Sequence, residues 1–170
     1  MASVQTESVR VRDDENLQAW QRVWRVGLVP QFTVAGLEGL RKALLEDRPS
    51  LITGSTMMPP PLMSMQHEAV EAVCPLCYAL LDGMRPEAVS VGPMEERFAE
   101  TCIRAEQLCG EPAAARYFLN WVDETPREQM RRELLAEVER ALPGHEQERR
   151  PPTPLERLLL ASIRMEEAKS

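Results

Sequence analysis

Residues 51–83 read LITGSTMMPPPLMSMQHEAVEAVCPLCYALLDG, and this stretch separates two regions of helical pattern. Its first half contains three consecutive prolines, 59–61, which favour polyproline geometry. The preceding Thr-Gly-Ser-Thr sequence, 53–56, is typical of a turn. Because a helix cannot continue through this combination, we predict a long loop over residues 51–65 that is rich in proline and methionine.

The second half of the stretch repeats apolar residues at steps of three and four, which is the period of a helix. We predict a helix from Gln66 to about Gly83. Pro75 lacks a backbone donor and disfavours helical geometry at Cys74. The segment is therefore either kinked there or divided into two helices, the second of which starts at Pro75.

Apolar residues on both sides of this stretch also recur at helical spacing. Thr33 is placed to cap one helix, in which Gly36 and Gly39 allow a neighbouring element to approach closely. Gly110 is placed to end another helix. Strand signals are almost absent. The sequence therefore predicts an all-α fold, an irregular bundle of six or seven helices.

We expect four parts along the chain. Residues 1–13 form a flexible N-terminal arm, and residues 14–142 form the helical core domain. Residues 143–152 (PGHEQERRPP) form a polar linker, in which His145 is expected to be solvated. Residues 153–170 form a C-terminal helix that can dock separately on its own body or on another molecule.

Length and charge narrow the class of protein. The chain has 170 residues, enough for one compact domain, and a net charge of −7. This acidic balance argues against nucleic acid and membrane surfaces as partners. The N-terminus lacks the features of a signal peptide, and no segment has the apolar length needed to span a bilayer. We therefore expect a cytoplasmic protein with reduced cysteines.

Cys74 and Cys77 are the tight cysteine pair of the sequence. Cys74-Pro75-Leu76-Cys77 has the CPxC form found at the start of the active-site helix in thioredoxin-like proteins, where the helix N-terminus stabilises the first thiolate. That arrangement needs a strand immediately before the motif, whereas residues 67–73 are predicted to be helical. The pattern therefore argues against dithiol redox catalysis.

Zinc is the second alternative for this pair, since CxxC is half of a common zinc site. The other two cysteines, Cys102 and Cys109, lie on one predicted helix, about 10.5 Å apart along its axis. Sulfur ligands of one zinc ion lie within roughly 4 Å of each other, so these two cannot share an ion. We predict no cofactor, with zinc bound by Cys74, Cys77, Cys102 and His67 as the alternative. Buried structural thiols are the third interpretation, favoured for Cys102 and Cys109.

The sequence contains no clustered carboxylates, phosphate-binding loop or Ser–His–Asp order, and we predict no catalytic residues. By elimination, we predict a non-enzymatic protein that acts through protein contacts, as a homo-oligomer or as an accessory subunit. A ligand or active site built from the backbone of the 51–65 loop stays open as an alternative.

Two surfaces are candidates for these contacts. One is the 51–65 loop, where methionines offer adaptable side chains. The other is the C-terminal helix, whose LERLL sequence at 155–159 has the LxxLL spacing of groove-docking helices, a spacing that core packing also produces. The candidate contact residues are Met57, Met58, Pro60, Leu62, Leu155, Leu158 and Leu159.

Overall fold

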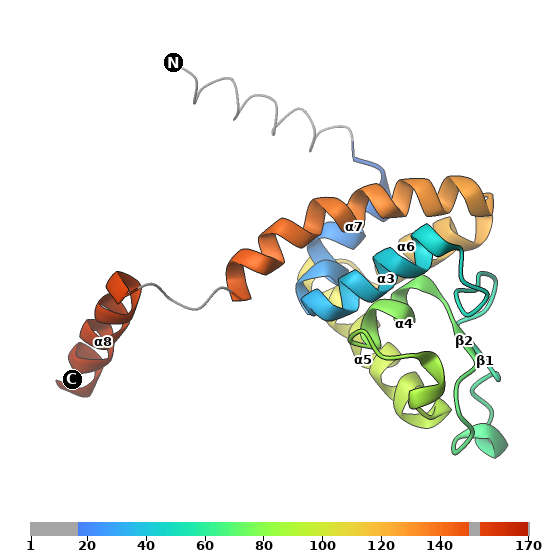
Figure 1. Cartoon of the computed structure of the whole chain (residues 1–170), viewed down its shortest axis with the longest axis horizontal. Helices are drawn as coiled ribbons and strands as arrows, with labels where there is room; N and C mark the ends of the chain where they lie inside the picture. Colours follow the sequence, from blue (N-terminus) through green and yellow to red (C-terminus); the bar gives the residue numbers. More distant parts are fainter. Residues whose placement is uncertain (1–16, 150–153, 170) are drawn as a thin grey trace.

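The computed structural model describes residues 17–149 and 154–169. Within these residues the chain forms seven α-helices, a π-helical turn at Trp24–Leu28 and one two-stranded sheet, which confirms the predicted all-α irregular bundle (Figure 1). The arm predicted at 1–13 lies outside the described residues. The helices are α2 (Ala19–Val23), α3 (Val34–Glu46), α4 (Pro75–Leu80), α5 (Val91–Cys109), α6 (Ala115–Glu124), α7 (Arg127–Arg149) and α8 (Pro154–Lys169); the strands are β1 (Met57–Met58) and β2 (Ala72–Val73); short 3-10 turns lie at Val29–Gln31, Met63–Met65 and Pro86–Ala88.

One hydrophobic core joins the helices from α2 to α7. Helix α3 packs on α7 and α4, while α2 and the π-helical turn pack on α6 and α5. Trp24 is fully buried, with its ring centroid 5.2 Å from that of Phe118 and 5.5 Å from that of Phe32. Trp20 stacks on Trp121 at a centroid distance of 3.5 Å. These rings remove large apolar areas from water, which is the main favourable contribution to folding.

The close approach between α3 and α4 depends on Gly36. The Thr33 hydroxyl accepts a hydrogen bond from the Gly36 N–H at 3.0 Å, which confirms Thr33 as the cap of α3. A Cβ on Gly36 would overlap the carbonyl oxygen of Ala79 in α4. Gly39 faces Gly83 in a similar way, so the predicted packing role of both α3 glycines is confirmed.

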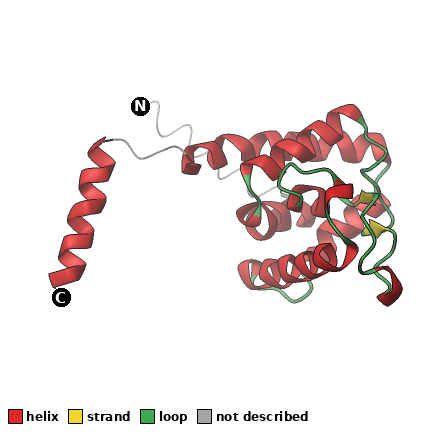
Figure 2. Ribbon diagram, turned by 60° about the horizontal axis from the view of Figure 1, so that its bottom comes forward, coloured by secondary structure: helices red, strands yellow, loops and turns green. Residues whose placement is uncertain are grey.

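The helix predicted over residues 66–83 is wrong in its first part. Residues 69–73 are extended, and β2 pairs antiparallel with β1 (Figure 2). Val73 also forms a parallel bridge with Leu51. These pairings with distant segments satisfy backbone hydrogen-bonding groups of the extended residues and bury apolar side chains. A helix in this segment would therefore offer no additional stabilisation. The predicted alternative of a helix starting at Pro75 is confirmed, because that residue begins α4.

Helix α7 continues past its predicted end at residue 142. It runs to Arg149 with Pro143 inside it, so most of the linker predicted at 143–152 is helical, and residues 150–152 lie outside the described residues. The His145 ring, expected to be solvated, lies with Nε2 3.0 Å from the carbonyl oxygen of Val29. This contact attaches the last part of α7 to the bundle.

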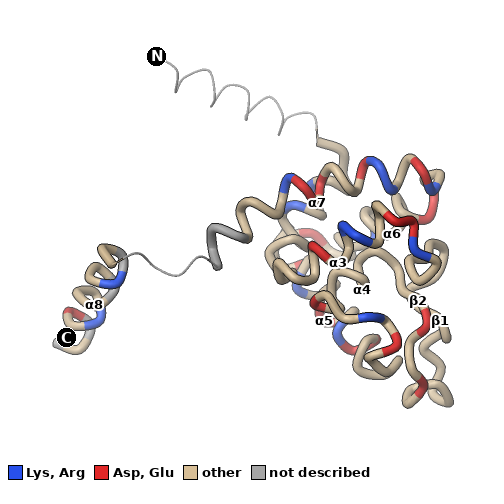
Figure 3. The backbone as a smooth tube through the Cα atoms, in the orientation of Figure 1, with Lys and Arg blue, Asp and Glu red and all other residues tan. Residues whose placement is uncertain are grey.

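Charged residues of both signs alternate along α7 (Figure 3). Arg127 donates hydrogen bonds to Asp47 Oδ1 at 2.8 Å and to the carbonyl oxygen of Leu51 at 2.9 Å. Further along the helix, Glu137 accepts from Arg25 at 2.7 Å. These contacts connect α7 to the end of α3, to the π-helical turn and to the start of the 51–65 loop.

Helix α8 lies apart from the bundle in both ribbon views (Figures 1 and 2). It is the C-terminal helix that the sequence predicts, and it presents apolar side chains to solvent. Neither α8 nor any other described helix combines the length and the apolar character needed to cross a membrane.

Candidate functional site

The structure places Cys74 at the junction of a strand and a helix. Val73 ends β2, Cys74 is the N-cap residue of α4, and Pro75 occupies the first helical position. The first N–H groups of a helix have no partner within it, and those of Leu76 and Cys77 act on the Cys74 sulfur. The thiol sulfur is a weak acceptor, and Cys74 forms no side-chain capping hydrogen bond. The two N–H groups nevertheless stabilise the ionised form of Cys74 relative to its neutral thiol.

The two thiols of the pair have different acidities. Hydrogen bonding from the Cys77 thiol, together with the helix N–H groups, lowers the pKa of Cys74 against the opposing effects of burial and of Asp123. The pKa of Cys77 is raised well above its ordinary value, because its thiol donates to Cys74 and because it is buried. The negative charge of the ionised pair therefore lies on Cys74, while Cys77 keeps its proton.

A small pocket lies beside the first of the two cysteines. Cys74 is only 3% exposed and Cys77 is fully buried, but Cys74 lines a pocket of about 150 Å³. The Cys74 N–H donates to the carbonyl oxygen of Thr56 at 2.9 Å, and Asp123 Oδ1 accepts from the Gly54 N–H at 2.8 Å. These bonds hold the 54–56 turn between β2 and α6. The pocket is lined by Gly54, Ser55, Thr56, Cys74, Leu119, Val122 and Asp123.

Cys102 and Cys109 lie on α5, which is one continuous helix as predicted. Both pack against the core. Burial raises the pKa of Cys102 to about 11, with smaller contributions from Cys74 and Glu106. A Cβ on Gly27 would lie 2.8 Å from the Cys109 sulfur, so this sulfur fills the space beside that glycine.

Three of the four residues in the alternative zinc site lie in one region. Cys102 is close enough to Cys74 and Cys77 for the charges of the three thiols to influence one another. His67 instead lines a separate pocket near the start of α5. Across residues 17–149 and 154–169, no group of three or more His, Cys, Asp or Glu side chains is arranged to hold a metal ion.

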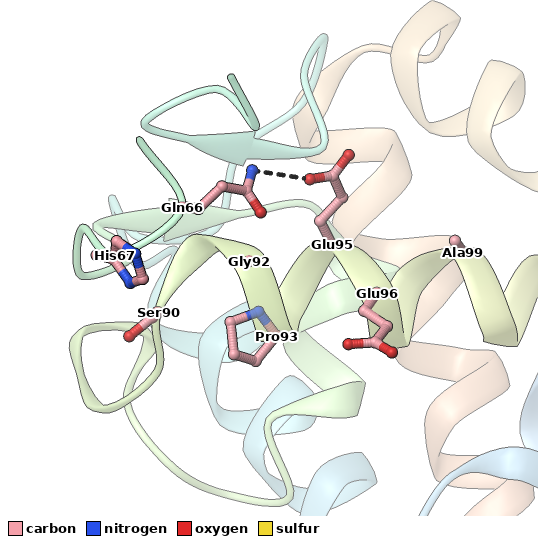
Figure 4. A pocket seen from close by; sticks show the side chains of 8 residues that line it. All are labelled: Gln66, His67, Ser90, Gly92, Pro93, Glu95, Glu96 and Ala99. Atoms are coloured by element: carbon pink, nitrogen blue, oxygen red, sulfur yellow. Dashed lines mark hydrogen bonds between the residues drawn. The ribbon is translucent and has the colours of Figure 1, made fainter. Parts of the chain in front are cut away.

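The pocket beside His67 has a volume of about 570 Å³ and lies beside the first turns of α5 (Figure 4). Gln66 Nε2 donates to Glu95 Oε2 at 3.2 Å, and His67 lies at the other end of the pocket from Glu96. The titratable groups therefore do not converge on one point. We regard this pocket as a surface hollow without the geometry of an acid–base site.

The predicted contact residues divide between the core and the surface. Met57 is fully buried and belongs to the core, whereas Met58 in β1 is exposed, as are Pro60, Leu62 and the almost fully exposed Met63 after it. On α8, five apolar side chains each expose more than half of their surface. These are Leu155, Leu158, Leu159, Ile163 and Met165.

Sequence reasoning missed the neighbours of Cys74. Residues 53–56 are predicted to form a turn, but nothing in the sequence places that turn beside a cysteine that lies about twenty residues later. Nor does any local pattern connect Asp123 with Cys74. The one available signal was Pro75, which restricts Cys74 to extended geometry and so indicated that the motif follows an extended segment.

Comparisons of the chain with protein-family models, with curated proteins and with solved structures found no match. Two features of the structure bear on the function of the protein: the exposed apolar side of α8 and the Cys74–Cys77 pair. The first concerns contacts with other molecules, and the second concerns thiol chemistry.

Proposed function

We propose that this protein acts through protein–protein contacts and that α8 is its main contact element. The observation that supports this proposal is the exposure of five apolar side chains on a helix that lies apart from the bundle. Contiguous apolar surface of this kind typically marks an interaction site. The cytoplasmic location expected from the sequence is part of the proposal.

The apolar residues of α8 share one side of the helix. Leu155, Leu158, Leu159 and Ile163 follow one another at spacings that place them on a common face. Arg164 follows Leu155 by about two and a half turns and therefore lies on the opposite side. Since full burial of one leucine contributes roughly 1.5–3 kcal/mol, this face can supply much of the free energy that association requires.

The partner that fits this face most simply is a second copy of the chain. Two α8 helices related by a two-fold axis would cover each other's leucines in an isologous contact. A different protein with an apolar groove would use the same side chains, and the chain would then be an accessory subunit. We favour self-association because it covers all the exposed leucines without a second component.

The tip of the 51–65 loop is a second contact surface. Met58 in β1 and Leu62 and Met63 after it are exposed, and the segment between β1 and β2 projects from the end of the bundle opposite α8 (Figure 1). Methionine side chains adapt to differently shaped partners. Because Met57 is anchored in the core, the backbone that presents these side chains is held in place.

Light scattering of the full chain over a range of concentrations tests the proposal. We expect an oligomer that dissociates to the monomer when Leu158 and Leu159 are both replaced by aspartate. Arg164→Asp places a carboxylate on the opposite side of α8 and is the matched control, which should associate like the unmodified chain. Dissociation by Leu62→Asp instead would assign the contact to the loop. A wild-type chain that is monomeric at every concentration would contradict self-association.

A further inference from the structure

Cys74 and Cys77 take no part in the contacts proposed for α8, and their arrangement supports a separate chemistry. Cys74, the N-cap residue of α4, and Cys77 are three residues apart, and the Cys77 thiol donates a hydrogen bond to the Cys74 sulfur. A disulfide requires about 3.5–4.5 Å between its Cβ atoms. CxxC pairs at helix N-termini close such bonds, so a local movement is enough to join the two sulfurs.

Only a small reactant fits beside this pair. Cys77 is fully buried, and Cys74, which is 3% exposed, lines a pocket of about 150 Å³. That volume corresponds to roughly five water molecules, which is too little for a folded protein disulfide to enter. The pocket wall includes the polar residues Ser55, Thr56 and Asp123, so a small polar molecule is the matching occupant.

We infer that Cys74 and Cys77 form a dithiol that small hydroperoxides oxidise, with Cys74 as the attacking sulfur and Cys77 as the resolving sulfur. In the first step the Cys74 thiolate bonds to one peroxide oxygen, the O–O bond breaks, and the other oxygen takes up a proton and leaves as water or an alcohol. Cys74 is then a sulfenic acid.

In the second step the Cys77 sulfur bonds to the Cys74 sulfur and the S–O bond breaks. The hydroxyl group leaves as water with the proton of Cys77. The two thiols together lose two electrons, and the peroxide gains them. The products are one disulfide, one water from the sulfenic acid, and the water or alcohol released in the first step.

The surrounding groups select Cys74 for the first step. Burial raises the pKa of both Cys102 and Cys109, so these thiols are poorer sources of thiolate. Asp123 raises the pKa of Cys74 through its negative charge. Asparagine at this position would remove the charge and keep an oxygen that accepts from the Gly54 N–H. Asp123→Asn is therefore a way to change the rate of the first step without removing a sulfur.

The test is oxidation of the full reduced chain by one equivalent of hydrogen peroxide at neutral pH. Thiol counting after unfolding should show a loss of two of the four thiols, and peptide mapping should show a Cys74–Cys77 disulfide. In Cys77→Ser, dimedone should trap a sulfenic acid on Cys74. Cys74→Ser should lose no thiols under the same conditions, while Cys102→Ser should react like the unmodified chain.

Several results would overturn the inference. One is oxidation at equal rates of all four thiols, or a disulfide that includes Cys102 or Cys109. Another is an unfolded chain in urea whose Cys74 reacts as fast as in the folded chain. The Asp123→Asn variant keeps both sulfurs and should move the pH profile of the oxidation rate to lower pH, because Asp123 raises the pKa of Cys74. An unmoved profile in that folded variant would contradict attack by a Cys74 thiolate.

Discussion

Replacing Glu137 by alanine should destabilise the bundle by about 3 kcal/mol. Glu137 lies on α7 and is only 5% exposed. Its two carboxylate oxygens accept from Arg25 Nε at 2.9 Å and from Arg25 Nη2 at 2.7 Å, and Oε1 also accepts from Gln21 at 3.1 Å. The alanine variant would thus remove two hydrogen bonds and a carboxylate charge from a guanidinium that is mostly withdrawn from water.

The expected magnitude follows from burial. Loss of one member of a buried ion pair typically costs about 3–5 kcal/mol, because the remaining charge stays in a poorly hydrated place. The Arg25 side chain is 20% exposed and so regains part of its hydration, which puts the cost at the lower end of that range. The matched control is Glu139 on the same helix, which pairs with Arg41 at 3.3 Å. Because both side chains of this pair are about half exposed, Glu139→Ala should cost less than about 1 kcal/mol.

Urea unfolding followed by circular dichroism measures both variants. The midpoint should fall in Glu137→Ala, while the slope of the unfolding free energy against urea stays unchanged. Replacing Arg25 by methionine in addition should recover part of the loss, because the guanidinium charge is then no longer held in a poorly hydrated place. If Glu137→Ala and Glu139→Ala unfold at the same midpoint, burial of the Arg25–Glu137 pair does not determine its contribution.

Two further predictions concern glycine and cysteine positions. Gly36→Ala should destabilise the fold by about 1–3 kcal/mol, because its Cβ would overlap the Ala79 carbonyl oxygen. Gly144→Ala, in open space on α7, should instead stabilise it by up to about 1 kcal/mol in the same urea unfolding assay. Burial raises the pKa of Cys102 to about 11, above the unfolded value of 9.0, so this thiol stabilises the fold below pH 9 and the contribution is lost as pH rises towards 11. The wild type should therefore lose more thermal stability over that pH range than Cys102→Ala, and parallel losses would contradict the assignment.

The helical part of the fold could be predicted because its determinants are local. Thr33 caps α3 and Gly110 ends α5 in the left-handed conformation, and both roles depend only on residues within a few positions. Gly36 was also recognisable, since a glycine inside a helix indicates close packing. The residue that it meets, Ala79, was not, because that contact joins segments more than forty residues apart.

The errors arise where distant contacts overrule a local pattern. Residues 69–73 have a helical spacing of apolar side chains, but β1 and Leu51 supply partners for their backbone, and these partners cannot be read from the segment itself. In α7, Pro143 predicted an end to the helix. The helix nevertheless continues to Arg149, and the His145 contact with Val29 holds part of that extension against the bundle.

The short sheet changes how the CPxC motif should be interpreted. The expected helix before Cys74 argued against dithiol chemistry, but the structure has Val73 in an extended strand, paired antiparallel with Met57 and parallel with Leu51. What the chemistry requires is local: a strand that delivers the first cysteine to a helix N-terminus, and a second cysteine one turn later. Two strands of two residues provide that geometry here within an all-α bundle. The absence of a large sheet among the described residues therefore excludes a thioredoxin-like fold for this part of the chain, but not the reactivity of its two sulfurs.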